Sequence, residues 1–261
     1  MWIEKYKNIS FSLDKNVLIA SFNRSEKLNS VNARLHTEMA WLWTDIEQDK
    51  SVHAVVLTGS GRAFCAGGDL DWFKNMTPEA LDKLFYEARL IIGSMLNVTK
   101  PIISAINGAA TGLGATLALL SDISYASENA VIADTHVLAG IGAGDGGGVI
   151  WPLLCGISRA KEYLMTGDKL TARDAEKIGL INHVVSENQL IVEAVSMAKR
   201  LAAGPRLAIT ATKIPINKII MQRMNLILDC SLALEKECFH TDDHKEAINS
   251  FLEKRKPIFN K

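Results

Sequence analysis

The chain has 261 residues, 48% of them hydrophobic, which is enough to bury a large core. Its 29 basic and 29 acidic side chains give a formal net charge of zero, which argues against nucleic acid or an anionic membrane as a partner. The N-terminal residues lack the apolar core of a signal peptide. Cys65, Cys155, Cys230 and Cys238 lie far apart and form no C-x-x-C pair, which favours reduced thiols in a cytoplasmic protein over a zinc site or disulfides.

The first half of the chain alternates predicted strands and helices, which indicates parallel βαβ units in an α/β fold. A charge-free stretch, residues 101–121, has glycines and an Asn107-Gly108 turn signal at its centre, so we predict a buried strand, a turn and a buried helix there, not a membrane span. The predicted elements begin with a hairpin (9–13 and 17–22), a helix (32–48), a strand (53–58) and a small-residue loop (59–68). They continue with a helix that is capped by Thr77 and runs to residue 95, a strand (102–106), a helix (112–120) and a strand (123–126).

The second half begins with a glycine-rich loop and then becomes helical. Six of the nine residues 140–148 are glycine, and helix is predicted from Val149. Further elements are a helix opened by the capping sequence 171–174, a strand at 182–185, helical sequence punctuated by Gly204-Pro205 and Pro215, and a last helix over 241–256. We therefore expect an α/β core over residues 1–185 and a helical region over residues 186–261.

Two glycine-containing segments follow buried strands and are candidate sites. In AFCAGGDL, residues 63–70, glycine either relieves strain in a strand-to-helix turn or exposes the Gly68 N–H to a ligand. In NGAATGLGATLALL, residues 107–120, glycine either allows close helix–strand packing or opens a helix whose first amides attract an oxyanion. Alone, the first segment is a weak signal, and the second is explained equally well by packing and by an oxyanion site.

Together these segments resemble the crotonase superfamily, also called the enoyl-CoA hydratase/isomerase family. The resemblance extends over nearly the whole chain through NRSEKLNSV (23–31), AFCAGGDL (63–70), KPIISAINGAATGLG (100–114), TGDKLTARDAEKIGLINHVV (166–185) and TDDHKEAINSFLEKRKPIF (241–259). It implies a ββα spiral core, a C-terminal helical trimerisation region, and assembly into a homotrimer or a dimer of trimers.

The resemblance also implies a site. Backbone amides of Gly68 and Leu113 would form an oxyanion hole for a carbonyl or enolate oxygen. The segments that bind acyl-CoA in the family match Glu26–Leu28 and Cys65–Gly68, so the implied substrate contacts are Lys27, Leu28, Cys65, Ala66 and Thr116. The resemblance also places Arg24, Lys27, Lys254 and Lys256 near the nucleotide phosphates, the last two from a neighbouring subunit; the alternative for each is a solvated surface charge. No metal and no cofactor is implied, except coenzyme A carried by the substrate.

The chain departs from the hydratase pattern at its two catalytic glutamates, whose positions are held by Thr116 and His136. A threonine hydroxyl has no useful pKa near neutrality, which puts ordinary hydration in doubt. His136 and Asp145 offer another pair if the glycine-rich loop folds back, with Asp145 supporting an imidazole that activates water. Alternatively, His136 is structural, and Asp145 caps the next helix or, as a comparable residue does in 4-chlorobenzoyl-CoA dehalogenase, acts as a nucleophile.

The spacing of His136 and Asp145, followed by Gly146 and Trp151-Pro152, is similar to that of the β-diketone hydrolases of this superfamily, exemplified by 6-oxocamphor hydrolase. This similarity implies retro-Claisen cleavage of a carbon–carbon bond, with water attacking one carbonyl and the leaving enolate held by the amide pair. We therefore expect a hydrolytic enzyme acting on a β-dicarbonyl compound or an acyl-CoA. The alternatives are a hydratase or isomerase with relocated acid/base groups, and a catalytically silent acyl-CoA-binding protein.

Overall fold

The computed structural model describes residues 2–260, and its largest sheet has six strands in the order β1-β2-β3-β5-β7-β10. The β1–β2 pair is the predicted hairpin and is antiparallel, whereas every other neighbouring pair is parallel. This confirms the predicted βαβ character. The strands are β1 (Ile9–Asp14), β2 (Val17–Phe22), β3 (Ala54–Gly59), β5 (Ile102–Ile106), β7 (Ile123–Ser127) and β10 (His183–Val185).

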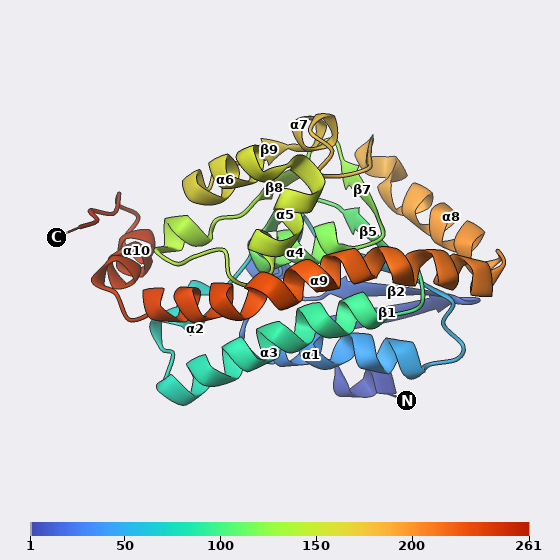
Figure 1. Cartoon of the computed structure of the whole chain (residues 1–261), viewed down its shortest axis with the longest axis horizontal. Coiled ribbons are helices and arrows are strands. Elements are labelled where there is room, and N and C mark those ends of the chain that lie inside the picture. Colours follow the sequence, from blue (N-terminus) through green and yellow to red (C-terminus); the bar gives the residue numbers. More distant parts are fainter. Residues whose placement is uncertain (1, 261) are drawn as a thin grey trace.

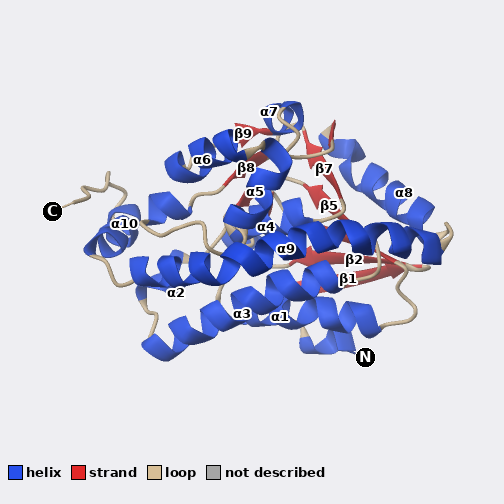
Figure 2. Ribbon diagram, viewed as in Figure 1, coloured by secondary structure: helices blue, strands red, loops and turns tan. Residues whose placement is uncertain are grey.

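The central strands of the sheet, such as β3 and β5, are buried on both faces because helices cover each side (Figure 2). In β3, Val55 and Leu57 face the main core, which includes residues of α1 (Ala33–Gln48) and α3 (Pro78–Asn97). The alternate residues Ala54 and Val56 face α8 (Leu190–Ala202) in a second core. This two-sided burial explains why the strand reads as a continuous apolar run.

Local sequence signals set the helix starts where they were predicted. The Asn32 side chain accepts a hydrogen bond from Leu35 N at the start of α1, and Thr77 caps α3 with proline at its first turn. Residues 101–121 form β5, a turn, β6 and the buried helix α4 (Leu113–Leu120), as expected. Among residues 2–260, none of the helices combines the length and hydropathy that crossing a bilayer requires.

A second sheet of four very short strands was missed by the sequence analysis. Its strand order is β4-β6-β8-β9, and the strands are β4 (Ala63–Cys65), β6 (Ala109–Thr111), β8 (Val131–Ala133) and β9 (Leu170–Thr171). The prediction of loop over residues 59–68 is therefore wrong for β4. Strands of two or three residues are too short to show a period, so only their pairing reveals them.

The remaining chain is largely helical, with three differences from the prediction. The last helix, predicted over residues 241–256, ends at Leu252. Helix α5 begins at Gly147, not at Val149, and Pro215 lies inside the long helix α9 without ending it. The elements are α2 (Leu70–Lys74), α5 (Gly147–Cys155), α6 (Ile157–Thr166), α7 (Ala172–Lys177), α9 (Arg206–Cys238), α10 (Asp242–Leu252) and the 3₁₀ helices η1 (Trp2–Lys5), η2 (Ser25–Lys27), η3 (His136–Ala139) and η4 (Glu187–Gln189). Helix α9 packs along α3 and α5 (Figure 1), and α10 folds onto α2 and η3.

Candidate active site

The first predicted amide donor, Gly68, lies where the chain leaves β4. Val31 N donates to the Gly67 carbonyl at 2.7 Å, and Asp69 N donates to the Val31 carbonyl at 2.9 Å. This bridge uses the main-chain groups on either side of Gly68, and within residues 2–260 no acceptor is found for the Gly68 N–H itself. The amide of Gly68 is therefore unpaired within the described residues, as an oxyanion donor requires.

The second predicted donor, Leu113, is the first residue of α4. Gly112 precedes it with a φ of +53° and donates its own N–H to the Ala133 carbonyl at 3.1 Å. The Leu113 N–H has no acceptor among the described residues, as expected for the first turn of a helix. A Cβ on Gly112 would lie 3.7 Å from the Gly67 Cα, so the loops that carry the two donors are in contact.

Cys65, in β4, packs against the start of α4 and is not a reactive thiol. A Cβ on Gly114 would lie 2.4 Å from the Cys65 carbonyl oxygen, so glycine is what allows α4 to pack against β4. Cys65 is fully buried, and this burial raises the pKa of its thiol to about 12. Cys65 therefore remains a neutral thiol that packs beneath the loop leading to Leu113.

The two segments implied in acyl-CoA binding lie side by side. Leu28 has a φ of +54°, and its carbonyl accepts a hydrogen bond from Ala66 N at 3.1 Å. This bond holds the turn that contains Lys27 against β4. The Lys27 ammonium is exposed and lies 3.5 Å from the Asp71 carboxylate, an ion pair of little stabilising value that a ligand can displace.

The cations assigned to the nucleotide phosphates occupy different environments. The Arg24 guanidinium is mostly buried, where it donates to the Ser30 carbonyl and pairs with Asp69 at 3.1 Å. It therefore holds the donor loop in place. Lys254 and Lys256 are exposed in the tail after α10, and their contribution from a neighbouring subunit stays a prediction.

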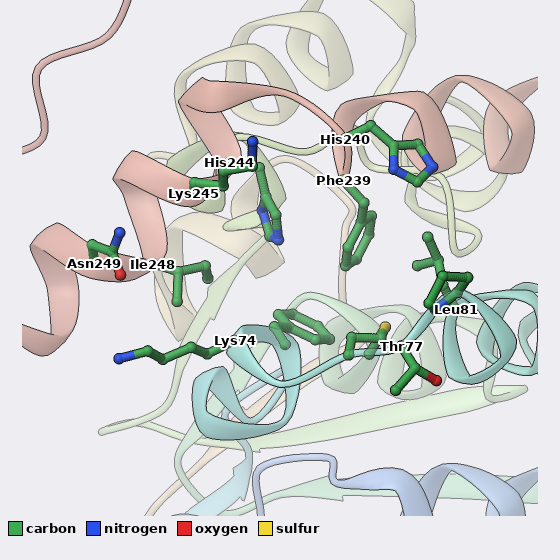
Figure 3. A pocket seen from close by; sticks show the side chains of 12 residues that line it. Lys74, Thr77, Leu81, Phe239, His240, His244, Lys245, Ile248 and Asn249 are labelled. Atoms are coloured by element: carbon green, nitrogen blue, oxygen red, sulfur yellow. The ribbon is translucent and has the colours of Figure 1, made fainter.

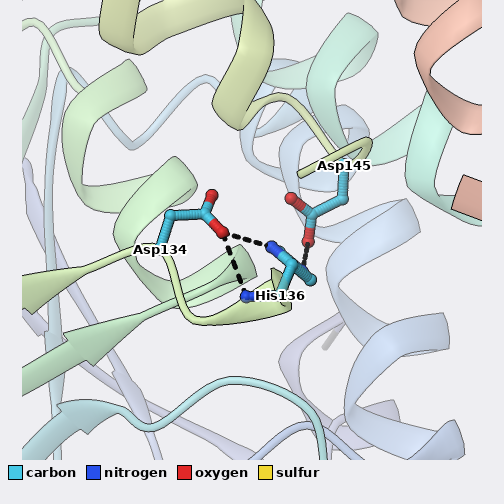
Figure 4. Close-up of side chains that lie close together, drawn as sticks. All are labelled: Asp134, His136 and Asp145. Atoms are coloured by element: carbon cyan, nitrogen blue, oxygen red, sulfur yellow. Dashed lines mark hydrogen bonds and ion pairs between the residues drawn. The ribbon is translucent and has the colours of Figure 1, made fainter. Parts of the chain in front are cut away.

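His136 is held by a residue that the sequence analysis missed, Asp134. One Asp134 carboxylate oxygen lies 2.6 Å from His136 Nδ1 and also accepts the His136 backbone N–H at 3.2 Å (Figure 4). Asp134 is fully buried. An aspartate two residues before a histidine commonly bonds the backbone in this way, and that spacing was the available signal.

The glycine-rich loop folds back and brings Asp145 to the other side of the same ring. Asp145 Oδ2 lies 3.2 Å from His136 Nε2, and the buried Thr116 hydroxyl donates to Asp145 Oδ1 at 3.4 Å. Gly146 allows this fold with a φ of +107°, because a Cβ there would lie 2.8 Å from the Thr116 side chain. The predicted His136–Asp145 contact is therefore formed.

A third carboxyl group, Glu235, reaches the cluster from α9. It is buried, and the Gly144 main chain hydrogen-bonds to it, whereas its Oε2 has no partner among residues 2–260. Burial raises the pKa of Glu235 well above its ordinary value; His136 opposes this shift, and Asp145 and Asp134 add to it. Burial therefore favours the neutral form of Glu235 beside the loop.

The charge state of His136 follows from its neighbours. Burial disfavours the imidazolium, but the carboxylates of Asp134 and Asp145 outweigh burial and hold the pKa of His136 well above its ordinary value. His136 is therefore protonated at neutral pH, with one N–H directed at each carboxylate.

Among residues 2–260, the side chains of Asp134, His136 and Asp145 have ligand atoms within 4.8 Å of one another, which is close enough to hold a metal ion. The two carboxylates face opposite nitrogens of one imidazole, and a single ion cannot be ligated by both nitrogens at once. The geometry thus favours a chain of hydrogen bonds over a metal centre.

The imidazole borders the amide donors. A Cβ on Gly112 would lie 3.3 Å from His136 Cε1, so the ring lies directly against the loop that leads to Leu113. The site thus combines two backbone donors for a developing oxyanion with a cation and a carboxylate that can exchange protons. Such a combination suits chemistry at a carbonyl group.

Comparisons with known proteins show the family of the chain. The family model of enoyl-CoA hydratase/isomerase matches residues 12–261. The short-chain-enoyl-CoA hydratase of Clostridium acetobutylicum is 34% identical, over 95% of this chain and 96% of that protein.

Two solved structures are similar along nearly their whole length. An enoyl-CoA hydratase/isomerase from Mycobacterium paratuberculosis has a TM-score of 0.91 and 37% identity, covering 94% of this chain and 98% of that one. A β-diketone hydrolase from the cyanobacterium Anabaena sp. PCC 7120, bound to (S)-3-oxocyclohexyl acetic acid, has a TM-score of 0.85 and 32% identity, covering 91% of this chain and 96% of that one. The chain belongs to the enoyl-CoA hydratase/isomerase family, that is, to the crotonase superfamily of enzymes.

Proposed function

We propose that this enzyme cleaves a carbon–carbon bond of a β-dicarbonyl compound by adding water to one of its carbonyl groups. The observation that carries the proposal is the Asp134–His136–Asp145 chain beside the Gly112 loop. The similarity to the cyanobacterial β-diketone hydrolase supports it. The substrate is a free β-diketone or a CoA thioester that carries a β-carbonyl group.

In the proposed first step, Asp145 accepts a proton from water while the water oxygen forms a bond to the carbonyl carbon. The former carbonyl oxygen becomes negative, and the His136 imidazolium, already protonated in the free enzyme, stabilises that charge. Asp134 keeps the ring in position through Nδ1. The pair thus activates water together: the carboxylate is the base and the imidazolium the electrophile.

In the second step, the bond between the attacked carbon and the α-carbon breaks, and its electron pair stays on the α-carbon as an enolate. The enolate oxygen accepts hydrogen bonds from Gly68 N and Leu113 N, whose N–H groups have no acceptor in the described chain. Asp145 then returns its proton to the α-carbon. The products are a carboxylic acid and a ketone, which stay joined as one keto acid when the diketone is cyclic; an acyl-CoA substrate releases a thioester in place of the ketone. Both catalytic side chains regain their starting charge.

A second candidate function is hydration or isomerisation of an enoyl-CoA. The similarity to the clostridial hydratase favours it, and Asp145 supplies a carboxylate beside Thr116, where the hydratase pattern places its first glutamate. In this reaction Asp145 would handle the proton and the same amide pair would bind the thioester oxygen.

The two functions are distinguished by turnover of cyclohexane-1,3-dione and of crotonyl-CoA. The proposal predicts cleavage of the diketone, reduced roughly 10²- to 10³-fold by His136→Ala and roughly 10²- to 10⁴-fold by Asp145→Asn. Asp168→Asn, an exposed carboxylate, is the control and should leave the rate unchanged.

Hydration of crotonyl-CoA that neither variant affects would overturn the role of the pair. Tight binding of CoA thioesters without turnover of either substrate would instead identify a silent acyl-CoA-binding protein.

A further inference from the structure

His244 is a buried histidine of α10 that takes no part in the proposed reaction. Its Nδ1 lies 2.7 Å from the carbonyl oxygen of Ala139, the last residue of η3. A carbonyl oxygen can only accept a hydrogen bond, so Nδ1 carries the proton and donates it. No main-chain N–H among residues 2–260 donates to the same carbonyl. The bond from His244 therefore joins α10 to the element that begins with His136.

The element η3 depends on its neighbours for its position. It has four residues, His136–Ala139, and none of these four belongs to either hydrophobic core. The chain that follows packs directly on α10: Gly140 has a φ of +70°, and a Cβ there would lie 2.9 Å from both the main-chain nitrogen and the Cα of His244. Helix α10 thus contacts the end of η3 by a hydrogen bond and the next residue by backbone packing.

The segment held in this way connects the two catalytic side chains. Ile141 N donates to the His136 carbonyl at 3.1 Å, and the chain reaches Asp145 four residues later. Asp145 Oδ2 lies 3.2 Å from His136 Nε2, a distance that depends on where the returning loop begins. A shift of Gly140 away from α10 would therefore move Asp145 relative to His136.

The His244 ring is itself fixed by aromatic neighbours. It lies beside the Phe239 ring, with centroids 4.6 Å apart (Figure 3), and 6.4 Å from the centroid of Phe73. Phe73 in turn covers the first amide donor, because a Cβ on Gly68 would lie 2.2 Å from Phe73 Cζ. Burial lowers the pKa of His244, although the Ala139 carbonyl opposes this shift, so the ring is neutral at neutral pH. One side chain thus contacts both η3, by a hydrogen bond, and α2, by ring packing.

We propose that His244 is a positioning residue that ties α10 to η3 and thereby sets the distance between His136 and Asp145. The hydrogen bond to Ala139 carries this role, and the aromatic packing keeps the ring in the orientation that the bond needs. The inference rests on the proposed function, because it assigns the chemical step to the pair that His244 holds together.

The test removes the donor and the ring separately. His244→Phe keeps an aromatic ring and removes the donor, whereas His244→Asn removes the ring and keeps a side-chain N–H near the position of Nδ1. NMR titration of the His136 ring, assigned with His136→Ala, reports the contact with Asp145. Because a nearby carboxylate raises the pKa of an imidazole, the midpoint should fall by about one unit in His244→Phe and stay at the wild-type value in His244→Asn.

The kinetics of diketone cleavage give the second measurement. In His244→Phe, kcat should fall roughly 10- to 10²-fold with little change in KM, since a misplaced catalytic group slows the reaction and leaves binding intact. His244→Asn should recover most of this loss. The control is His240→Phe, the same exchange at an exposed histidine four residues earlier, which should match the wild type in both measurements.

Circular dichroism verifies the fold of each variant. If His244→Phe does not fold, His244→Gln takes its place, because the longer side chain brings its amide nitrogen to the position of Nε2 and not to that of Nδ1. The same losses are expected of it.

The inference is overturned if the midpoint and kcat of the variant without the donor equal those of the wild type, if His244→Asn loses as much, or if His240→Phe shows the same loss. The titration is independent of the reaction. A midpoint that falls in His244→Phe and is restored in His244→Asn, together with failure of the wild type to cleave any β-diketone, would overturn the proposed reaction and retain the positioning role of His244.

Discussion

Asp134 Oδ1 lies 2.6 Å from His136 Nδ1, so the histidine is oriented by the residue two positions before it, and Asp145 is left facing Nε2. This arrangement gives the two aspartates different tasks. Asp134 is fully buried and fixes the ring, whereas Asp145 is the carboxylate that stands between the imidazole and Thr116.

The first prediction concerns Asp134→Asn. This substitution replaces the carboxylate beside Nδ1 with a neutral amide, so the pKa of His136 should fall. Loss of the orienting carboxylate should also lower kcat for diketone cleavage roughly 10²- to 10⁴-fold. NMR titration of the His136 ring would measure the pKa, and circular dichroism would verify the fold. An unchanged titration midpoint would show that Asp134 does not control the ring.

The second prediction is the pH dependence of cleavage. Burial lowers the pKa of His136, but the two carboxylates beside it raise that pKa by more. The proposed step needs the protonated imidazolium form. The rate should therefore fall as pH rises through this raised pKa, and in Asp134→Asn the fall should begin at lower pH. A rate that instead increases as His136 loses its proton would identify the neutral imidazole as the base.

The third prediction is the pH dependence of stability at Glu235. Burial raises the pKa of this carboxyl in the folded state, so its favourable contribution is complete below its ordinary pKa of about 4.3 and is lost as pH rises through the folded value. Glu235→Gln should therefore lose less thermal stability than the wild type between mildly acidic and alkaline pH.

Scanning calorimetry across pH measures this difference, with the exposed Glu237→Gln on the same helix as control. Melting temperatures of Glu235→Gln and wild type that fall in parallel would contradict a raised pKa of Glu235 in the folded state.

The fourth prediction compares the stability effects of alanine at two glycines, one tightly packed and one with open space beside it. In Gly114→Ala the new methyl would meet the Cys65 carbonyl oxygen at 2.4 Å, so we expect a loss of about 1–3 kcal/mol of unfolding free energy. In Gly93→Ala, within α3, the nearest atom is 3.9 Å away, and the change should stabilise by about 0.5–1 kcal/mol. Urea unfolding measures both, and equal effects would refute the close contact of α4 with β4.

Much of the fold was predictable because its signals are local. The apolar run of β3 and the caps Asn32 and Thr77 act within a few residues, and the structure confirms them. The strands of the second sheet were not predictable, because a strand such as Ala63–Cys65 exists only through its pairing with Ala109–Thr111.

The candidate site divides in the same way. The sequence by itself determined the family and indicated the two donor loops, which depend on motifs in order. It offered the pairing of His136 with Asp145 as a hypothesis that required the glycine-rich loop to turn back. Only the tertiary structure decided that Asp134 fixes the ring, that Glu235 arrives from α9, and that Phe73 covers Gly68. The reason is physical: hydrogen-bond partners, burial and the pKa values that they set depend on which distant segments pack together, and no short stretch of sequence contains that information.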